Sequence, residues 1–358
     1  MANLYCLLLL FACGVAGDTC LRVPKEHAAL FVFGDSLFDV GNNNYINTTA
    51  DNQANYPPYG DTFFKYPSGR FSDGRVVPDF IAEYAKMPLI QPYLFPGYQQ
   101  YVYGVNFASA GAGALVETHP GLVIDLNTQL SYFKKVSKVL RQQLGDKETT
   151  RLLAKAVYLI NIGINDYMIS MSQNSTSSTE KYVGMVVGNL TTVIKGIHKT
   201  GGRKFGIFSL PAMGCIPAVK ALVNGFKGSC VEEASALARL HNSVLLLELE
   251  KLKKELKGIK YSYIRYYDLS FQVIKNPSKY GLKEGSVACC GSGAYRGYYS
   301  CGGKRAVKDY ELCDNPNEYV LFDSVHPTQR TDEIISQLIW SGNQSIAGPY
   351  NIKTLFQA

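Results

Sequence analysis

The sequence lacks several features that would point to a membrane or nucleic-acid function. Beyond the N-terminus it has no run of about 18 apolar residues, so no later segment is expected to span a bilayer. Lysine and arginine outnumber aspartate and glutamate by 36 to 29, but they are scattered along the chain. The densest stretch, Lys251–Lys257, alternates in sign, which is typical of a solvated helix face. We therefore expect no nucleic-acid partner and no transmembrane segment.

Motifs of other chemistries are missing as well. No Cys-x-x-Cys pair has zinc-like spacing, so we expect neither a metal site nor another cofactor. The Gly-x-Ser-x-Gly elbow of one large hydrolase fold is absent, which disfavours that fold. No internal repeat or low-complexity segment interrupts the 358 residues, of which 46% are hydrophobic and 18% charged. Such a chain has enough apolar material for a well-buried core.

The N-terminal segment has the character of a secretory signal. The first 17 residues carry no charged side chain, and Leu4–Val15 is almost wholly apolar. Small residues at 15–17 suit a cleavage site, which predicts a signal peptide over residues 1–17 that is cut before Asp18. The segment has no lysine or arginine, and a short buried strand or helix is the competing interpretation. Residues 18–358 are expected to form a single domain.

Glycosylation sequons and cysteines agree with secretion. Four sequons are present, at Asn47, Asn174, Asn189 and Asn343. Of nine cysteines, two lie in the predicted signal. Four others cluster late and are expected to form two bridges that staple a loop: Cys289, Cys290, Cys301 and Cys313. Cys215 and Cys230 could close a third loop, which leaves Cys20 over, and spacing alone does not give the connectivity.

Apolar runs alternate with segments of helical periodicity. Four runs predict buried strands, at Ala28–Phe33, Val157–Ile162, Phe205–Leu210 and Ile259–Tyr267. Three segments predict helices between them, at Leu126–Leu144, Tyr182–His198 and Val231–Leu256. This alternation predicts a three-layer α/β/α domain with a mainly parallel sheet. Asn42–Gly104 is expected to be largely irregular.

Unusual residues follow three of the predicted strands, where ligands of parallel sheets bind. These segments are Gly34–Ser36, Gly163–Asp166 and Pro211–Gly214. Ser36 lies in a tight turn that would expose its hydroxyl, although a serine there is also a common helix N-cap. As a nucleophile it needs a base to take its proton.

Histidine is the most suitable base, and the chain has five. His326 stands out because Asp323 precedes it by three residues, within reach of the imidazole Nδ1–H. Acyl transfer also needs oxyanion donors. The Ser36 N–H, a backbone N–H near Gly111 and the Asn165 amide are candidates, and each of the last two is equally typical of a plain turn.

Four blocks of the sequence resemble, in the same order, the motifs of the plant GDSL esterase/lipase family, a branch of the SGNH hydrolases. The blocks are Phe33–Asp39, Gly104–Gly111, Gly163–Asp166 and Asp323–Pro327. The cysteine-rich segment Ala288–Cys313 is also similar to this family, and the resemblance runs from about Ala28 to about Trp340.

The resemblance implies a flavodoxin-like SGNH fold and a catalytic triad of Ser36, Asp323 and His326. It also implies an oxyanion hole made by Ser36, Asn165 and a second-block glycine, for which we choose Gly111 over Gly104 or Gly113. The implied protein is a secreted serine hydrolase, in the apoplast or cell wall, that cleaves lipid or small acyl esters without a cofactor.

Alternative functions remain open from the sequence. The same triad serves an acyltransferase that uses an alcohol in place of water. A secreted, defence-associated binding protein with little activity is the alternative outside enzymes. The aromatic stretch around Tyr56, Tyr59, Phe63 and Phe64 is a hypothetical wall of the cleft. The oligomeric state is not readable.

Overall fold

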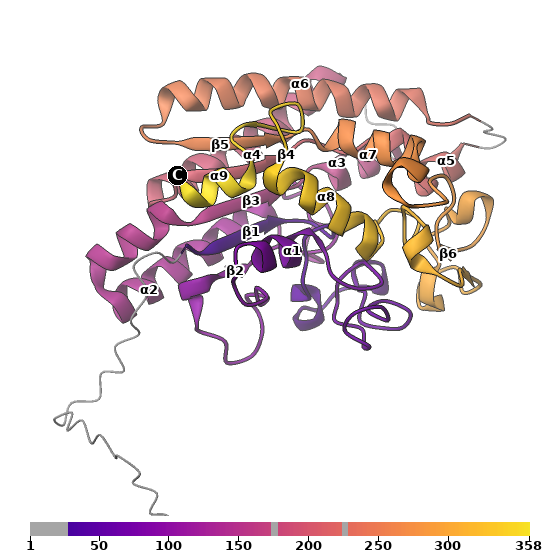
Figure 1. Ribbon diagram of the computed structural model, residues 1–358, viewed down its shortest axis with the longest axis horizontal. Helices are drawn as coiled ribbons and strands as arrows, with labels where there is room; N and C mark the ends of the chain where they lie inside the picture. Colours follow the sequence, from indigo (N-terminus) through magenta and orange to yellow (C-terminus); the bar gives the residue numbers. More distant parts are fainter. Residues whose placement is uncertain (1–27, 173–177, 224–227) are drawn as a thin grey trace, which may run out of the picture.

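A twisted, mainly parallel sheet forms the centre of the molecule (Figure 1). The computed structural model describes residues 28–172, 178–223 and 228–358. The strands, in spatial order, are β2 (Gly104–Asn106), β1 (Leu30–Gly34), β3 (Val157–Asn161), β4 (Lys204–Phe208), β5 (Lys260–Ile264) and β8 (Ala347–Pro349). The first five are parallel, and β8 pairs antiparallel with β5. The order of the parallel strands is that of the flavodoxin-like fold, with its switch point between β1 and β3.

Helices cover both faces of the sheet, which explains why the strands are continuous apolar runs. One face is covered by α2 (Leu126–Lys155), α4 (Thr179–Thr200) and α6 (Glu232–Glu255). The other is covered by α1 (Val77–Tyr84), α8 (Gln329–Ser341), α9 (Ile352–Gln357) and the first half of α7 (Tyr266–Lys275). Along β1, Phe31 and Phe33 point to the first layer while Leu30 and Val32 point to the second. The three-layer α/β/α prediction is confirmed.

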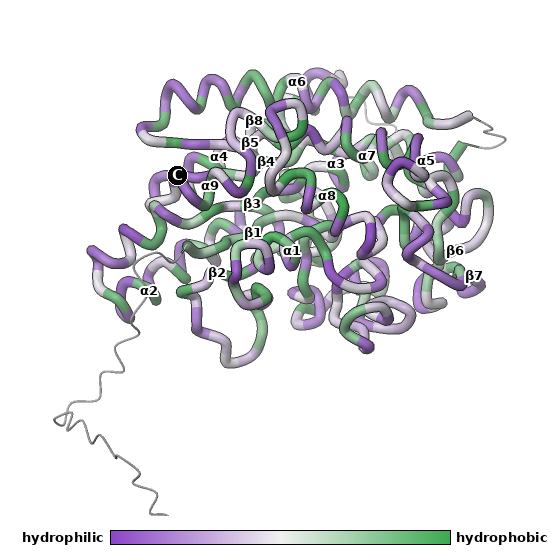
Figure 2. The backbone as a smooth tube through the Cα atoms, viewed as in Figure 1, coloured by the Kyte–Doolittle hydropathy of each residue, from purple (hydrophilic) through white to green (hydrophobic). Residues whose placement is uncertain are grey.

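The helices of the first layer have identifiable ends and faces. The Asp125 side chain caps α2 by accepting from the N–H groups of Asn127 and Thr128, and Ser178 caps α4 through the Lys181 N–H. Gly145 has non-helical φ/ψ, so α2 is two helices joined at a kink. Purple and green alternate along α6 in Figure 2, because one side packs on the sheet and the other faces water.

Shorter elements gather around the ends of the strands. They are α3 (Ile164–Ser172), α5 (Pro217–Leu222) and a small antiparallel sheet of β6 (Cys290–Gly291) and β7 (Glu311–Leu312). The short 3-10 helices are Asn42–Tyr45, Ala50–Asn52, Tyr101–Tyr103, Met213–Cys215, Pro277–Tyr280, Ala294–Arg296, Cys301–Gly303 and Pro316–Glu318. The segment that contains β6 and β7 lies beside α5 at one end of the molecule (Figure 1).

The sequence predicted the long elements and missed the short ones. The four predicted strands are present as β1, β3, β4 and β5, although β5 ends at Ile264 and Tyr266 already begins α7. Asn42–Gly104 is largely irregular, as expected, but it contains α1. β2 and β8 have three residues each, too few to show an alternation of apolar and polar side chains.

The described residues contain three disulfides, and their pairing is now defined. Cys215 bonds to Cys230, Cys289 to Cys313 and Cys290 to Cys301. The expected two bridges in the late cluster and the third in the short loop are therefore confirmed. We name residues 289–313, which hold two of the bridges, the stapled segment.

The structure describes some of the residues named in the sequence predictions and leaves others outside its described ranges. The predicted signal peptide, Cys20 and Asn174 lie outside the described residues. Among the other sequons, the side chains of Asn47 and Asn343 are exposed, whereas Asn189 is half-buried on α4. Within residues 28–172, 178–223 and 228–358, no helix combines the length and the apolar character needed to cross a membrane.

The Gln129 side chain on α2 fixes the end of β1. Its Oε1 accepts from the Gly34 N–H at 2.9 Å, and its Nε2 donates to the carbonyls of Gly34 at 2.8 Å and Ile124 at 2.9 Å. Gln129 is fully buried, so water cannot replace these bonds. This amide therefore holds the strand in place at the point where the chain turns into Ser36.

We predict that Gln129→Leu lowers the free energy of unfolding by about 1–3 kcal/mol, because it leaves the buried Gly34 N–H without a partner. Urea denaturation of the variant measures this loss. Gln142→Leu is the matched control, since Gln142 is an exposed glutamine on the same helix. Equal stability of the two variants would contradict the role assigned to the Gln129 amide.

Candidate active site

Ser36 lies in a tight turn directly after β1. Gly34 has a φ of 152°, and a Cβ there would collide with the Asn161 carbonyl of β3, so only glycine fits. The Asp35 carbonyl accepts from the N–H groups of Phe38 and Asp39, which closes the turn behind Ser36. The Ser36 side chain is 8% exposed and faces a cavity. It is therefore not a helix N-cap, because the turn does not continue into a helix.

Ser36, His326 and Asp323 are joined in series by hydrogen bonds. Ser36 Oγ lies 2.8 Å from His326 Nε2, and His326 Nδ1 lies 2.8 Å from both carboxylate oxygens of Asp323. Asp323 and His326 are buried in a loop just before α8. Asp323 Oδ1 also accepts from the backbone N–H groups of Val325 and His326, which fixes the carboxylate against its own loop. The structure thus brings together the three residues that the sequence singled out.

Two buried carboxylates hold the loop after β2 beside Ser36. Asp39 accepts from the Ala110 N–H at 3.0 Å, and Asp166 accepts from the N–H groups of Ala114 and Leu115 at 2.9 and 3.0 Å. Gly111 lies between these two anchors and has a φ of 81°. The loop is thereby fixed to the turn after β1 on one side and to α3 on the other.

Three residues with N–H groups to donate line the cavity that Ser36 Oγ faces. Within the described part of the chain, the backbone N–H groups of Ser36 and Gly111 find no protein acceptor. Asn165 Nδ2 donates one hydrogen to the Ala112 carbonyl at 2.9 Å, and a primary amide has a second hydrogen to give. All three residues line the same cavity. Such a group of donors suits an oxygen that acquires negative charge.

Gly104 and Gly113, the alternative candidates for the glycine of the oxyanion hole, lie away from the cavity. Gly104 begins β2, where a Cβ would collide with Leu30 of β1, so its role is close strand pairing. Gly113 packs against Asp166 and Thr118. Neither lines the cavity, and Gly111 does.

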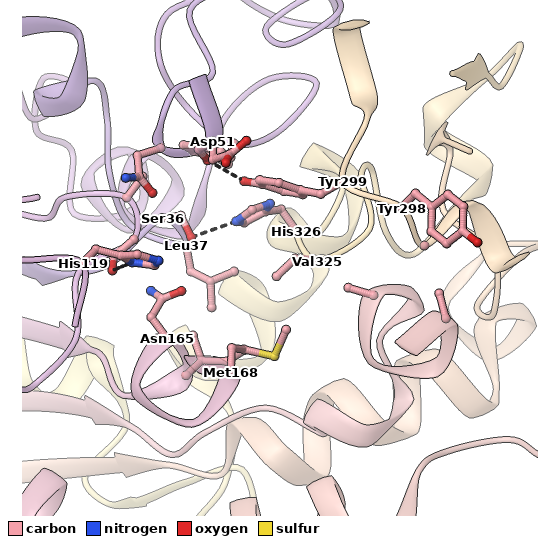
Figure 3. A pocket seen from close by; sticks show the side chains of 18 of the residues that line it. Ser36, Leu37, Asp51, His119, Asn165, Met168, Tyr298, Tyr299, Val325 and His326 are labelled. Atoms are coloured by element: carbon pink, nitrogen blue, oxygen red, sulfur yellow. Dashed lines mark hydrogen bonds between the residues drawn. The ribbon is translucent and has the colours of Figure 1, made fainter. Parts of the chain in front are cut away.

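The cavity in front of Ser36 has a volume of about 480 Å³, which suits a small-molecule site. Figure 3 shows Ser36 and His326 at its centre, with His119 beside them and Tyr298 far from them. Its remaining lining is mainly apolar and comes from the turn after β1, α3, α5, the stapled segment and the His326 loop: Leu37, Ile164, Met168, Ala218, Ala221, Leu222, Val307 and Val325.

The hypothesis that the stretch around Tyr56 and Phe64 walls the cleft is not supported. Phe63 and Phe64 lie under the guanidinium groups of Arg75 and Arg70, and neither phenylalanine lines the cavity. The aromatic side chains of this stretch are used for packing and for cation–π contacts.

Tyr59 and Arg305 support the Asp323 carboxylate, and sequence reasoning did not find this role. Tyr59 Oη donates to Asp323 Oδ2 at 2.7 Å and accepts from Arg305 Nη1 at 2.9 Å. Burial raises the pKa of Tyr59 well above its usual value, so the phenol keeps the proton that it donates. Arg305 is buried among aromatic rings, with Tyr299 closest at 3.7 Å. No local motif marks these residues, because Tyr59 and Asp323 are 264 residues apart.

Opposing effects act on the pKa of Asp323. Burial would raise it, but the charges of His326 and Arg305 and the hydrogen bonds from His326 and Tyr59 outweigh burial and hold the pKa below its usual range. Asp323 therefore stays ionised, and its charge faces the imidazole of His326.

His119 also lines the cavity, although the sequence did not single it out as a catalytic candidate. Its Nδ1 lies 2.8 Å from the Gly111 carbonyl, so this nitrogen carries the hydrogen and donates it. The residue has a φ of 50°, a conformation that histidine seldom adopts. This contact fixes the peptide that follows Gly111.

The described residues contain no candidate metal site. Across the ranges that the structure describes, no three histidine, cysteine or acidic side chains are grouped as a metal site.

A hydroxyl, an imidazole and a carboxylate in series, beside unpaired N–H groups, form the arrangement used for nucleophilic acyl transfer. It lies at the switch point between β1 and β3, where flavodoxin-like sheets bind ligands. Fold and site together are typical of the α/β serine hydrolases.

The comparisons with known proteins specify the family. The chain belongs to the GDSL-like lipase/acylhydrolase family, whose model matches residues 30–339. It is 51% identical to GDSL esterase/lipase 5 of Arabidopsis thaliana, over 92% of this chain and 87% of that protein. It is 47% identical to a GDSL lipase of Tanacetum cinerariifolium, over 94% of this chain and 92% of that protein. The predicted family is confirmed, and the protein is a carboxylic ester hydrolase.

Asp35 makes the stability of the site dependent on pH. Burial raises the pKa of Asp35 from 3.8 to about 7, and one carboxylate oxygen has no hydrogen-bond partner among the described residues. The folded protein therefore keeps a proton that the unfolded chain releases above about pH 4. The contribution of Asp35 to the stability of the folded protein therefore falls as the pH rises from about 4 to about 7.

We predict that Asp35→Asn, which mimics the protonated carboxyl, removes this dependence. The stability of the variant relative to the native protein should rise between about pH 4 and 7 and level off above. Urea denaturation at several pH values measures the difference, with Asp61→Asn at an exposed position as the control. A difference that is constant with pH would show that Asp35 does not titrate in this range.

We predict that Tyr59→Phe lowers kcat/KM by about tenfold, because Asp323 loses a hydrogen bond to its charged carboxylate. The acid limb of the pH–rate profile should move to higher pH, since a less neutralised Asp323 favours the protonated imidazole.

Tyr56→Phe is the matched control for this variant. Tyr56 packs in the same aromatic cluster around Arg305, but its hydroxyl hydrogen-bonds Ala50 and does not reach Asp323. An unmoved acid limb in Tyr59→Phe would leave Tyr59 with a packing role only.

Proposed function

We propose that this protein cleaves carboxylic esters, of lipids or small acyl groups, through an acyl-enzyme on Ser36. His326 is the general base and acid, and Asp323 orients and stabilises the imidazole. The observation that carries the proposal is the 2.8 Å contact from Ser36 Oγ to His326 Nε2, with Asp323 bound to the other ring nitrogen. This order of groups gives Ser36 the base that a serine nucleophile needs.

The proposed reaction has two halves. His326 Nε2 takes the Ser36 proton while Ser36 Oγ bonds to the ester carbonyl carbon, and the carbonyl oxygen becomes negative. Collapse of this intermediate breaks the bond to the alcohol oxygen, which leaves with the proton from His326. Water, deprotonated by His326, then attacks the acyl carbon and releases the acid and Ser36.

The oxyanion would be held by the N–H groups of Ser36 and Gly111 and by the Asn165 amide. Each such donor stabilises the transition state by about 3–4 kcal/mol in related systems. In support, the backbone N–H groups of Ser36 and Gly111 have no other acceptor in the described chain. Asp39 and Asp166 hold the Gly111 loop in advance, so little reorganisation is needed on binding.

We also propose that the protein is secreted, with residues 1–17 as a signal peptide and 18–358 as one domain. Three disulfides support an oxidising compartment. The exposed sequons at Asn47 and Asn343 are accessible for glycosylation, and Asn189 is less so. An extracellular location, in the apoplast or cell wall, follows from the same proposal.

We predict that Ser36→Ala abolishes hydrolysis of p-nitrophenyl butyrate, with a loss of at least about 10³-fold in kcat, and leaves the melting temperature unchanged. A fluorophosphonate probe should label the native protein and not this variant. Ser336→Ala is the control, because Ser336 is buried on α8 and its hydroxyl has no partner.

Retention of full activity in Ser36→Ala would refute the assignment of the nucleophile. Adding an acceptor alcohol to the same assay separates hydrolysis from acyl transfer. Formation of a new ester faster than release of free acid would identify the protein as an acyltransferase.

A further inference from the structure

The cavity has two unlike sides. Figure 3 shows Asp51 and Tyr299 on one side of the Ser36–His326 contact, and Leu37 and Met168 on the other. The Tyr299 hydroxyl donates to the Asp51 carbonyl at 2.9 Å, which links the two residues of the polar side. The cavity is also lined by Met168, α5 and the stapled segment, and we name this part, which includes Ala218, Ala221 and Tyr298, the apolar arm.

The apolar arm has small residues along its α5 wall. Ala218 and Ala221 lie one helical turn apart, so they share the face of α5 that lines the cavity. Opposite them, Gly297 packs so closely on α5 that a Cβ would collide with Ala221. Leu222 and Tyr298, 69% and 49% exposed, lie at the outer end.

Disulfides and a backbone bond hold the walls of the apolar arm. The Cys215–Cys230 bridge closes the loop that carries α5, and the Cys290–Cys301 bridge closes the loop that carries Tyr298. The Ala218 N–H donates to the Ser324 carbonyl at 2.9 Å, which ties α5 to the loop of Asp323. The arm is therefore formed before any ligand binds, which lowers the cost of binding.

We propose that the apolar arm is the acyl subsite and that Ala218 and Ala221 determine how long an acyl chain it accepts. The inference rests on the ester hydrolysis proposed above and names its substrate class, esters of apolar medium-length or long acyl chains. Among the described residues that line the cavity, Asp51, His119, Tyr299 and His326 lie close to Ser36 or on the polar side, and the titratable group of the arm is the Tyr298 phenol at its outer end.

The position of His326 favours the acyl group over the alcohol in the apolar arm. The leaving oxygen has to come within reach of His326 Nε2, on the side where Asp51 and Tyr299 lie. Leu37, Asn165 and Met168 lie on the opposite side of the Ser36–His326 contact. An alcohol thus departs toward polar groups while the acyl chain stays among apolar ones.

Substitution of Ala218 by leucine tests the proposal, because the larger side chain fills the apolar arm near its start. Each methylene that the arm takes from water contributes about fourfold to affinity. For Ala218→Leu we expect kcat/KM for p-nitrophenyl octanoate, relative to the acetate, to fall at least tenfold. The value for the acetate itself should fall much less than that for the octanoate.

A second variant and a control make the result specific. Met168→Ala widens the apolar arm and should raise the octanoate-to-acetate ratio. Ala236→Leu makes the same change as Ala218→Leu at an exposed position of α6, outside the cavity, and should leave the ratio unchanged. An equal loss for all esters in Ala218→Leu, or a changed preference for the alcohol instead of the acyl group, would overturn the proposal.

Measuring how the Ser36→Ala variant binds esters separates this inference from the proposed function, because the variant binds without turnover. Equilibrium dialysis with ethyl octanoate and ethyl butyrate measures chain-length preference without turnover. Tighter binding of the octanoate, lost on adding Ala218→Leu, supports the arm even if the native protein hydrolyses no ester. Hydrolysis by the native protein without any preference in binding would refute the arm alone.

Discussion

Two buried carboxylates, Asp39 and Asp166, fix the geometry on which the site depends. They bind backbone N–H groups on either side of Gly111, so the loop after β2 is fastened to the turn after β1 and to α3. Burial raises the pKa of both, to about 6 for Asp39, yet each carboxylate receives several hydrogen bonds that oppose this effect. Without these anchors, the Gly111 loop would lose its charged attachments to the turn after β1 and to α3.

The same loops are also joined by side-chain amides. Asn42 Nδ2 donates to the carbonyls of Asn106 and Ala108, and Asn43 Nδ2 donates to those of Asn52 and Ala110. Without these bonds, the irregular segments after β1 and β2 would leave backbone carbonyl groups unpaired in the interior. The asparagines therefore provide the hydrogen bonds that a regular strand would have obtained from its neighbours.

The sequence predicted the long strands and helices and the candidate site residues that follow them. β1, β3 and β4 are continuous apolar runs, and Ser36 and Asn165 follow two of them directly, so the strand ends predicted the site. Asp323 and His326 were recognisable because they are three residues apart. The pairing of Tyr59 with Arg305, by contrast, arises only when the chain has folded, and no spacing in the sequence encodes it.

The placement of the disulfides has a consequence for how the protein responds to its redox surroundings. Ser36, Asp323 and His326 all lie outside the loops closed by Cys215–Cys230 and Cys290–Cys301, whereas both walls of the apolar arm lie inside them. Thiol reductants would cleave the two bridges that hold the walls of the apolar arm. Ser36, Asp323 and His326 lie outside the loops that these bridges close. Under the proposal that the arm is the acyl subsite, the two disulfides therefore support selectivity among substrates more than the capacity for the reaction itself.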